Sequence, residues 1–463
     1  METAELTRTG LNPEGFAVFL ARRAGEPAWM TEQRTIAWDL FQNLPMPTRK
    51  DEEWRRVDLR SIRFDDIAPF APVVGARSDR PEVLQARVDL GPHSDGLLIQ
   101  RNSEDIHSEL SAGLRAKGVI WCGFDEAVRR HEDIVRTYYG TVRPPAGGKF
   151  TALHYAFQSG GAFLYVPPGV QIDVPLRNLV FADAPGFGLF PHTLIVLDRG
   201  ARLTYFEERV ASRPAPGARQ NLVSSVAEIH MKDGAQIRFM SLQEYDPQTY
   251  NFSSEKAVGG RDASVAWLTA ELGGKLNKGF IDCDLTGSGG RCELLGLYFI
   301  NGRQQSDIVT LLTHKAPHTE GNILYKGVCD DFARSGFRGR IVVQHAANQT
   351  QSFLADHTML LSDKSRSDSV PTLEIEANDV VCKHAATVGE ISEEELFYLR
   401  SRGIPEALAK KMIILGFYEE VLKGVPAAAL QERVRRALQA KFDMRDHDTP
   451  DIEGGDMEWR TNS

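Results

Sequence analysis

Between about residue 150 and residue 390, apolar and polar positions alternate in short runs that are separated by Gly, Asp, Asn and Pro. Val, Ile, Leu, Phe and Tyr fill the apolar positions, and stretches with helical periodicity are scarce. Alternation with a period of two is typical of β-strands, because successive side chains point to opposite faces. The pattern therefore predicts a mainly β core over residues 149–390.

A weak repeat runs through this β region. Residues 197–205 align with residues 231–239, and fainter copies begin at Asp262 and Gly290. Recurrence at an irregular interval of roughly 20–50 residues indicates a solenoid whose turns stack strands on one another. A β-sandwich would fit the alternation equally well.

Helical patterns flank the β region on both sides. Residues 1–148 are predicted to form a helical and mixed α/β region, with a boundary at the Pro- and Gly-rich residues 144–148. Residues 391–442 are predicted to be helical, and the polar tail 443–463 is expected to be disordered.

Helix start and stop signals support the C-terminal prediction. Ser392 and Glu395 have the spacing of a capping box, and Gly403 is a stop signal. Pro405 suits the first position of a second helix. A third, amphipathic helix is predicted at about 426–441.

One short stretch carries candidate metal chemistry. Residues 373–378 alternate apolar residues with two glutamates, and Cys382 and His384 follow shortly after. If the strand register continues through the Asn–Asp pair at 378–379, the thiol and the imidazole share the face of the glutamates. Because Asn and Asp are turn residues, the register could equally change there. Thiolate and imidazole are both competent iron ligands, although a buried Cys and a hydrogen-bonded His would give the same pattern.

Composition narrows the class of protein. Hydrophobic residues make up 42% and charged residues 25% of the 463 positions, as in ordinary globular proteins. The net charge of −9 argues against a general nucleic-acid binder. We see no secretory signal and no apolar run near the ~20 residues that span a membrane, so we expect a cytoplasmic protein.

Motifs of several catalytic and metal-binding classes are absent. The five cysteines include no CxxC pair, which disfavours a zinc ribbon or a ferredoxin-type cluster site. The chain has no P-loop, no HExxH and no GxSxG. We therefore expect a protein that is not an enzyme, and if its pathway needs ATP a partner supplies the ATPase.

Residues 373–403 resemble the C-terminal core signature of the SufB/SufD family, which functions in SUF iron–sulfur cluster assembly, and in particular its SufD branch. The resemblance covers the Cys382-Lys383-His384 motif, residues 386–389 and residues 396–404, with Lys383 and Ala385 departing from the usual small residues. Weaker matches occur at 161–170, 322–328 and 337–341. The resemblance implies a right-handed parallel β-helix core, which decides against the sandwich.

The resemblance also implies a function. It predicts a scaffold subunit that pairs with a SufB-like homologue through the end of the β-helix and binds a SufC-like ABC ATPase through its C-terminal helices. His384 and, with less support, Cys382 are the candidate iron or cluster ligands at the subunit interface. No cofactor is expected to bind firmly, and iron or a cluster would be held transiently. The alternatives are a SufB-type homodimeric scaffold and a β-helix enzyme that acts on polysaccharides, which would need a secretion signal and a carboxylate pair in a groove.

Overall fold

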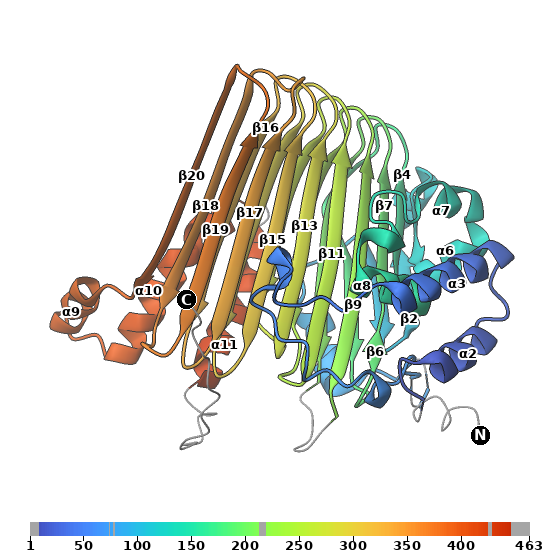
Figure 1. Ribbon diagram of the computed structural model, residues 1–463, viewed down its shortest axis with the longest axis horizontal. Coiled ribbons are helices and arrows are strands. Elements are labelled where there is room, and N and C mark those ends of the chain that lie inside the picture. Colours follow the sequence, from blue (N-terminus) through green and yellow to red (C-terminus); the bar gives the residue numbers. More distant parts are fainter. Residues whose placement is uncertain (1–8, 74, 77–78, 213–218, 425–427, 446–463) are drawn as a thin grey trace.

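The computed structural model describes residues 9–73, 75–76, 79–212, 219–424 and 428–445 (Figure 1). Its centre is a parallel β-helix, a β-solenoid of about eight turns in which the chain passes back and forth between two facing sheets. N-terminal helices cover one end of the solenoid, and C-terminal helices lie near the other end (Figure 1). The predicted mainly β fold with helical flanks is confirmed.

Strands from successive turns are neighbours in each sheet. The first sheet contains, in order, β2 (Glu104–Leu110), β1 (Gly96–Arg101), β5 (Gln171–Ala182), β8 (Arg202–Ala211), β10 (Gln236–Glu244), β12 (Ser264–Glu271), β14 (Arg291–Ile300), β16 (Glu320–Cys329), β18 (Thr350–Leu360) and β20 (Val380–Glu390). The second contains β19 (Arg366–Ile375), β17 (Arg334–Val343), β15 (Gln305–His314), β13 (Leu276–Leu285), β11 (Thr249–Gly259), β9 (Asn221–Met231), β7 (His192–Leu197), β4 (Gly161–Val166) and β3 (Ile120–Gly123), with β6 (Gly188–Leu189) beside β9. Antiparallel pairing joins β1 to β2 and β3 to β4, and the successive turns of the solenoid pair in parallel.

The predicted repeat corresponds to stacked turns in the first sheet. Leu203 of β8 pairs with Ile237 of β10, which pairs with Val265 of β12, and Val265 in turn pairs with Cys292 of β14. All four side chains are buried in one continuous apolar core between the sheets. One turn of a solenoid cannot bury its apolar face alone. Similar residues at equivalent positions of successive turns stack on one another and bury that face together, so the sequence repeats.

The N-terminal region packs a second apolar core against the first turns of the solenoid. Its helices are α2 (Pro13–Arg22), α3 (Ala28–Asn43), α4 (Glu82–Leu90), α5 (Ala112–Ala116), α6 (Phe124–Arg130), α7 (Glu132–Tyr138) and α8 (Lys149–Phe157), with the short 3₁₀ helices η1 (Glu52–Trp54), η2 (Phe64–Asp66) and η3 (Pro145–Gly147). Because β1, β2 and β3 extend the two sheets, the region is α/β in character, as the sequence predicts.

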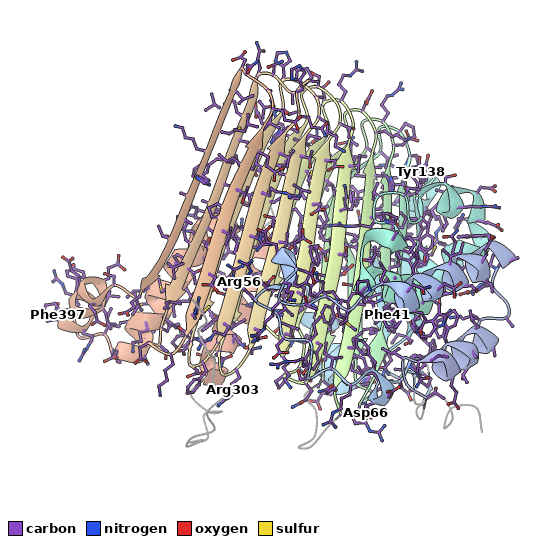
Figure 2. All side chains as sticks on the ribbon, viewed as in Figure 1. Phe41, Arg56, Asp66, Tyr138, Arg303 and Phe397 are labelled. Carbon is purple, nitrogen blue, oxygen red and sulfur yellow. The ribbon has the colours of Figure 1, made fainter. Side chains whose placement is uncertain are left out.

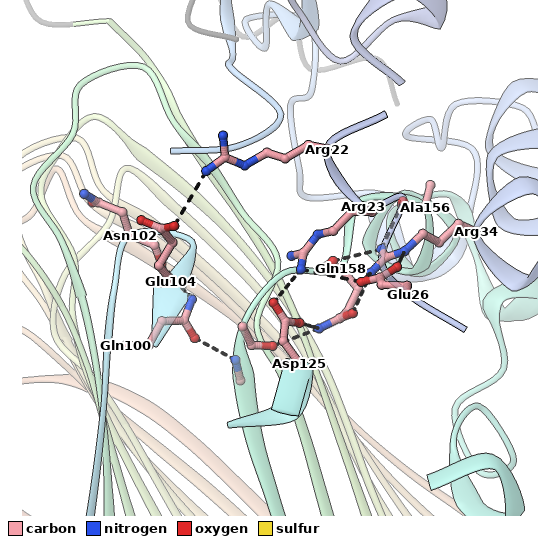
Figure 3. A network of polar contacts seen from close by, with 12 residues as sticks. Arg22, Arg23, Glu26, Arg34, Gln100, Asn102, Glu104, Asp125, Ala156 and Gln158 are labelled. Atoms are coloured by element: carbon pink, nitrogen blue, oxygen red, sulfur yellow. Dashed lines mark hydrogen bonds and ion pairs between the residues drawn. The ribbon is translucent and has the colours of Figure 1, made fainter. Parts of the chain in front are cut away.

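A buried polar network locks these helices together (Figure 3). The guanidinium of Arg34, fully buried on α3, lies 2.8 Å from the carboxylate of Glu26 and donates to the side chain of Gln158 at 3.0 Å. Arg23 donates to Asp125 on α6 at 2.5 Å. Each buried charge is therefore matched by an opposite charge, which is the condition for burying it at low cost.

The C-terminal helices are α9 (Glu393–Ser401), α10 (Glu406–Lys423) and α11 (Ala428–Arg445). Ser392 caps α9 by accepting a hydrogen bond from the Glu395 backbone N–H at 3.2 Å, as predicted. Gly403 has a φ of +85°, a conformation that glycine adopts at low cost after a helix. The predicted position of Pro405 is wrong by one residue, since this proline precedes α10 as its N-cap.

Helices α10 and α11 cover the outer face of the first sheet. Phe206 of β8 and Leu297 of β14 point outward and pack with Tyr418 of α10 and Leu438 of α11 in a third apolar cluster. Helix α11 ends at Arg445, so residues 443–445 of the tail that was expected to be disordered are helical. The remainder of that tail, 446–463, lies outside the described residues.

Candidate functional site

Cys382 and His384 lie on β20, and this strand is not a continuation of the preceding one. Strand β19 ends at Ile375 in the second sheet, and the chain turns and enters the first sheet at Val380. The Asn–Asp pair at 378–379 occupies this turn, consistent with the turn preference of both residues. The sequence left open whether one strand continues through residues 378–379 or the register changes there. The chain changes sheet at this point, so the prediction of one continuous strand is wrong.

The thiol and the imidazole face the interior of the solenoid. Cys382 pairs with Ser352 of β18 and packs against the apolar core, and His384 pairs with Leu354, which is fully buried in that core. Residues two apart on a strand share a face, so the His384 side chain projects to the same side as Cys382. Glu374 lies outside, with its carboxylate 3.5 Å from Arg340. The two candidate ligands thus share a face with apolar residues and not with the glutamates.

Strands β19 and β20 form an open end of the solenoid, at the upper left of Figure 1. In the described chain, each of these strands has a hydrogen-bonded neighbour on one side only. Large apolar side chains are exposed here, namely Phe353, Ile375, Val381 and Val388. An unpaired strand edge with exposed apolar residues is a surface on which another chain can add a strand.

The open end carries two candidate metal ligands of this chain, Cys382 and His384. His384 is exposed and Cys382 is half-buried, and partial burial raises the pKa of the Cys382 thiol. Among the residues that the structure describes, no group of three or more His, Cys, Asp or Glu side chains is placed to hold a metal ion. A thiolate and an imidazole suit iron or an iron–sulfur cluster, but a complete site would need ligands from a second chain or from the cargo itself.

The sequence analysis missed a line of buried polar groups inside the solenoid. Arg209 of β8 donates to Glu207 at 2.5 Å and to Glu255 of β11 at 2.7 Å. Further along, burial raises the pKa of Glu271 to about 7, with Glu255 adding to the effect, and burial raises the pKa of Asp356 to about 6. Glu207 and Arg209 continue the inward face of β8 that begins with Leu203, but both faces of this strand are buried, so alternation alone does not mark these two residues as inward.

A second missed feature is a buried pair of histidines where the N-terminal region meets the solenoid. His154 Nδ1 lies 2.7 Å from the Ser224 carbonyl oxygen, His154 Nε2 lies 3.0 Å from His192 Nδ1, and His192 Nε2 lies 3.2 Å from the carboxylate of Glu228. These contacts form a buried chain from the Ser224 carbonyl through both rings to the Glu228 carboxylate.

Burial dominates the pKa shift of His154. It lowers the pKa of His154 well below its ordinary value, and the neighbouring His192 lowers it further. Burial alone would raise the pKa of Glu228, but His192 and the backbone N–H groups of Gly140 and Arg143 bring it below its ordinary value. We interpret the cluster as structural, since all three side chains are fully buried.

The fold and the open end define a β-solenoid protein with two candidate metal ligands, Cys382 and His384, on its terminal strand β20. Two family models match this chain. "SufBD protein N-terminal region" matches residues 21–177, and "SUF system FeS cluster assembly, SufBD core domain" matches residues 180–417. The chain therefore belongs to the SufB/SufD family of SUF iron–sulfur cluster assembly proteins.

Relatives of known name agree with this assignment. The "Iron-sulfur cluster assembly protein SufB" of Bacillus subtilis (strain 168) is 32% identical over 437 residues, which cover 92% of this chain and 91% of that protein. An "Iron-sulfur cluster assembly SufBD family protein" of Staphylococcus epidermidis (strain ATCC 12228 / FDA PCI 1200) is 31% identical over 442 residues, covering 93% and 92% of the two chains. These names support the family and do not favour the polysaccharide-acting alternative. None of the described helices is long and apolar enough to cross a membrane.

Proposed function

We propose that this chain is a SufD-type scaffold subunit that has no catalytic activity of its own and acts in the cytoplasm. It pairs with a SufB-like homologue at the open end of the solenoid and binds a SufC-like ABC ATPase through its C-terminal helices. The observation that carries the proposal is the position of Cys382 and His384 on β20, a terminal strand that pairs with β18 on one edge and has its other edge free in the described chain. The Cys-x-His-Ala-Ala-Thr sequence at 382–387 favours the SufD branch.

Pairing at the open end accounts for two features at once. A second solenoid that adds its last strands to β19 and β20 would satisfy their free hydrogen-bonding groups and cover exposed Val381 and Val388. The same contact would bring further ligands to Cys382 and His384, which lack them within the described chain. Iron or a nascent cluster would then be cargo held between two subunits, bound transiently rather than as a resident cofactor.

The ATPase surface of the proposal is the exposed side of α9 and α10. Phe397 is 74% exposed and projects from α9 at the edge of the molecule (Figure 2), and Tyr398, Leu408 and Met412 are also exposed. Contiguous apolar side chains on a charged surface are characteristic of a protein–protein contact. Because α10 also packs on the first sheet through Tyr418, movement of a bound ATPase would be transmitted to the solenoid.

Native mass spectrometry after anaerobic co-expression with a SufB-like and a SufC-like protein tests the assembly. We expect a mixed complex that contains one copy of this chain. His384→Ala should leave the mass of that complex unchanged and abolish its loading with iron and sulfide. The matched control is His357→Ala, because His357 lies on the outer face of β18 near Lys326 and Glu420, whereas His384 projects from the opposite face. Normal loading of the His384→Ala complex would remove this residue from the mechanism.

A SufB-type homodimer is the alternative within the family. It is favoured by the naming of the Bacillus subtilis relative as SufB. In that case two copies of this chain would meet at their open ends, and each would contribute its own Cys382 and His384. A native mass of two copies in the presence of the SufB-like protein would establish it.

A further inference from the structure

A cavity of about 420 Å³ lies on the outer face of the second sheet and extends as far as Thr372 and Glu374 of β19. It is bounded by the start of α8, by outward side chains of strands β11 to β19, and by residues 47–54, which we call the strap. The strap belongs to the N-terminal segment that crosses the strands of this sheet in Figure 1. Lys278 of β13 fixes the strap by donating to the Glu53 carbonyl oxygen at 2.6 Å.

One wall of the cavity is aromatic. The rings of Phe150 and Phe252 stack with centroids 3.7 Å apart and an interplanar angle of 10°. Trp54 of the strap stacks on Phe150 at 5.4 Å and lies 5.8 Å from Phe280. Phe150 and Phe252 are buried, so the half-buried Trp54 and Phe280 offer the preformed apolar surface that a planar ligand body would contact.

Arg338 of β17 faces the cavity with part of its guanidinium unmatched. Its Nε and Nη1 atoms are buried and have no hydrogen-bond partner in the described structure. Its Nη2 atom lies 3.7 Å from Glu52, whose side chain is 74% exposed. Arginine is always charged in proteins, and burying its N–H groups without acceptors costs free energy that an anionic ligand would recover.

The N-terminus of α8, with the partial positive charge of the helix dipole, also faces the cavity. Residues 147–151 line the cavity, and no side chain caps this nine-residue helix at Gly148. The first N–H groups of a helix lack partners within the helix, and they carry its partial positive charge. Arg143 lies beside them, with its Nε also buried without a partner.

The carboxylates around the cavity are either paired with an arginine or exposed to solvent. Asp282 is paired with Arg143 at 2.8 Å. Glu374 lies 3.5 Å from Arg340 and is half-exposed, and Glu52 and Glu53 are exposed, so water can solvate these three groups. An anion that contacts Arg338 and the start of α8 therefore meets donors rather than acceptors.

We propose that this cavity binds a small phosphate ester with a flat, apolar body. The phosphate would lie between the Arg338 guanidinium and the N-terminus of α8. The guanidinium can donate two hydrogen bonds to phosphate oxygens, and the first backbone N–H groups of the helix can donate to the others. The body would rest on the half-buried rings of Trp54 and Phe280, and Trp54 in turn packs on the buried Phe150. The volume lies within the range of roughly 300–1,000 Å³ that small-molecule sites occupy. The contacts proposed here do not depend on the proposed function, because Arg338, the start of α8 and the aromatic side chains lie outside β19 and β20.

Calorimetric titration of the purified full-length chain with phenyl phosphate, inorganic phosphate and phenol tests the site. We expect phenyl phosphate to bind more tightly than either fragment, because only it contacts both halves of the cavity. Arg338→Gln should weaken phenyl phosphate binding by about tenfold or more, which corresponds to about 1.4 kcal/mol. Arg303→Gln removes the same charge from an exposed position outside the cavity (Figure 2) and should bind like the wild type.

Arg338→Lys keeps the positive charge but cannot donate two parallel hydrogen bonds to the phosphate. We therefore expect its affinity for phenyl phosphate to lie between those of the wild type and Arg338→Gln. This variant also keeps the proposal testable if Arg338→Gln fails to fold, which its thermal midpoint reports. The proposal is overturned if the wild type shows no saturable binding of phenyl phosphate at millimolar concentration. Equal affinity of the wild type and a folded Arg338 variant, or equal affinity for phenol and phenyl phosphate, would overturn it as well.

Discussion

Arg433 of α11 lies 2.8 Å from Glu208 of β8, although 225 positions separate them in the chain. The same guanidinium lies 2.7 Å from Glu244 of β10, and the Arg433 and Glu208 side chains are almost completely buried. Two ion pairs from one arginine thus join the last helix to two consecutive turns of the solenoid. Helix α11 is fixed to the first sheet by charge as well as by its apolar face.

Replacing Arg433 by Gln should loosen α11. The change leaves buried carboxylates with fewer partners, and removal of one member of a buried pair typically costs about 3–5 kcal/mol. We expect the lower end of this range, because Arg177 still pairs with Glu208 and Arg87 with Glu244. Hydrogen exchange measured by mass spectrometry should become faster across 428–445.

Arg436→Gln is the matched control for this experiment. Arg436 is on the same helix and pairs with Glu432, but both side chains are about half-exposed. An exposed pair one helical turn apart contributes well under about 1 kcal/mol. Unchanged exchange in Arg433→Gln, or an equal change in Arg436→Gln, would show that apolar packing alone holds α11.

Glu271 should make the stability of the solenoid depend on pH. Burial and the nearby Glu255 raise the pKa of Glu271 from 4.5 to about 7, against the weaker influences of Ser306 and Arg209. Between these two values the unfolded chain releases the proton while the folded chain keeps it. The free energy of unfolding therefore falls as the pH rises through this interval. The difference of 2.5 pKa units corresponds to about 3 kcal/mol at neutral pH.

Glu271→Gln removes this proton linkage and retains the shape of the side chain. We expect the variant to unfold at a higher temperature than the wild type at pH 7.5, with a smaller difference at pH 5. Glu374→Gln is the control, since Glu374 is half-exposed on the outer face of β19. Parallel pH profiles for the wild type and Glu271→Gln would contradict the assigned pKa.

The sequence predicts how the turns of the solenoid stack better than it predicts which side chains of each strand point into the solenoid and which point outward. The register of Leu203 with Ile237 and Val265 could be read from the repeat, because identical local patterns stack in a solenoid. The inward position of Glu207 could not, because α10 and α11 cover the outer face of the first sheet and bury Phe206 as well. With both faces buried, alternation no longer distinguishes the interior from the exterior.

The candidate site shows the same division. Cys382 and His384 could be found from residue type and spacing, and their common face follows from the period of a strand. Whether that face points into the solenoid depends on the turn at 378–379, where the local sequence does not distinguish a change of sheet from a straight continuation of the strand. The phosphate cavity gave no sequence signal, because Trp54, Phe150 and Arg338 meet only through the fold.

Cys382 should be the most reactive of the five cysteines in the folded protein. It is half-buried, whereas Cys122, Cys283, Cys292 and Cys329 are buried. Burial raises the pKa of Cys122 and that of Cys329 to about 12, so their thiolates are scarce at neutral pH. Because the thiolate is the reactive form, access favours Cys382 over all four buried cysteines, and ionisation favours it over Cys122 and Cys329 as well.

Brief treatment of the native chain with iodoacetamide, followed by peptide mass spectrometry, measures this directly. We expect alkylation at Cys382 first, with a rate that increases between pH 7 and pH 9, because its pKa lies above the ordinary value for a thiol. Addition of the SufB-like partner should slow the reaction, since pairing at β19 and β20 would cover this strand. Equal labelling of Cys382 with and without a stably bound partner would place the interface elsewhere and leave the open end free in the complex.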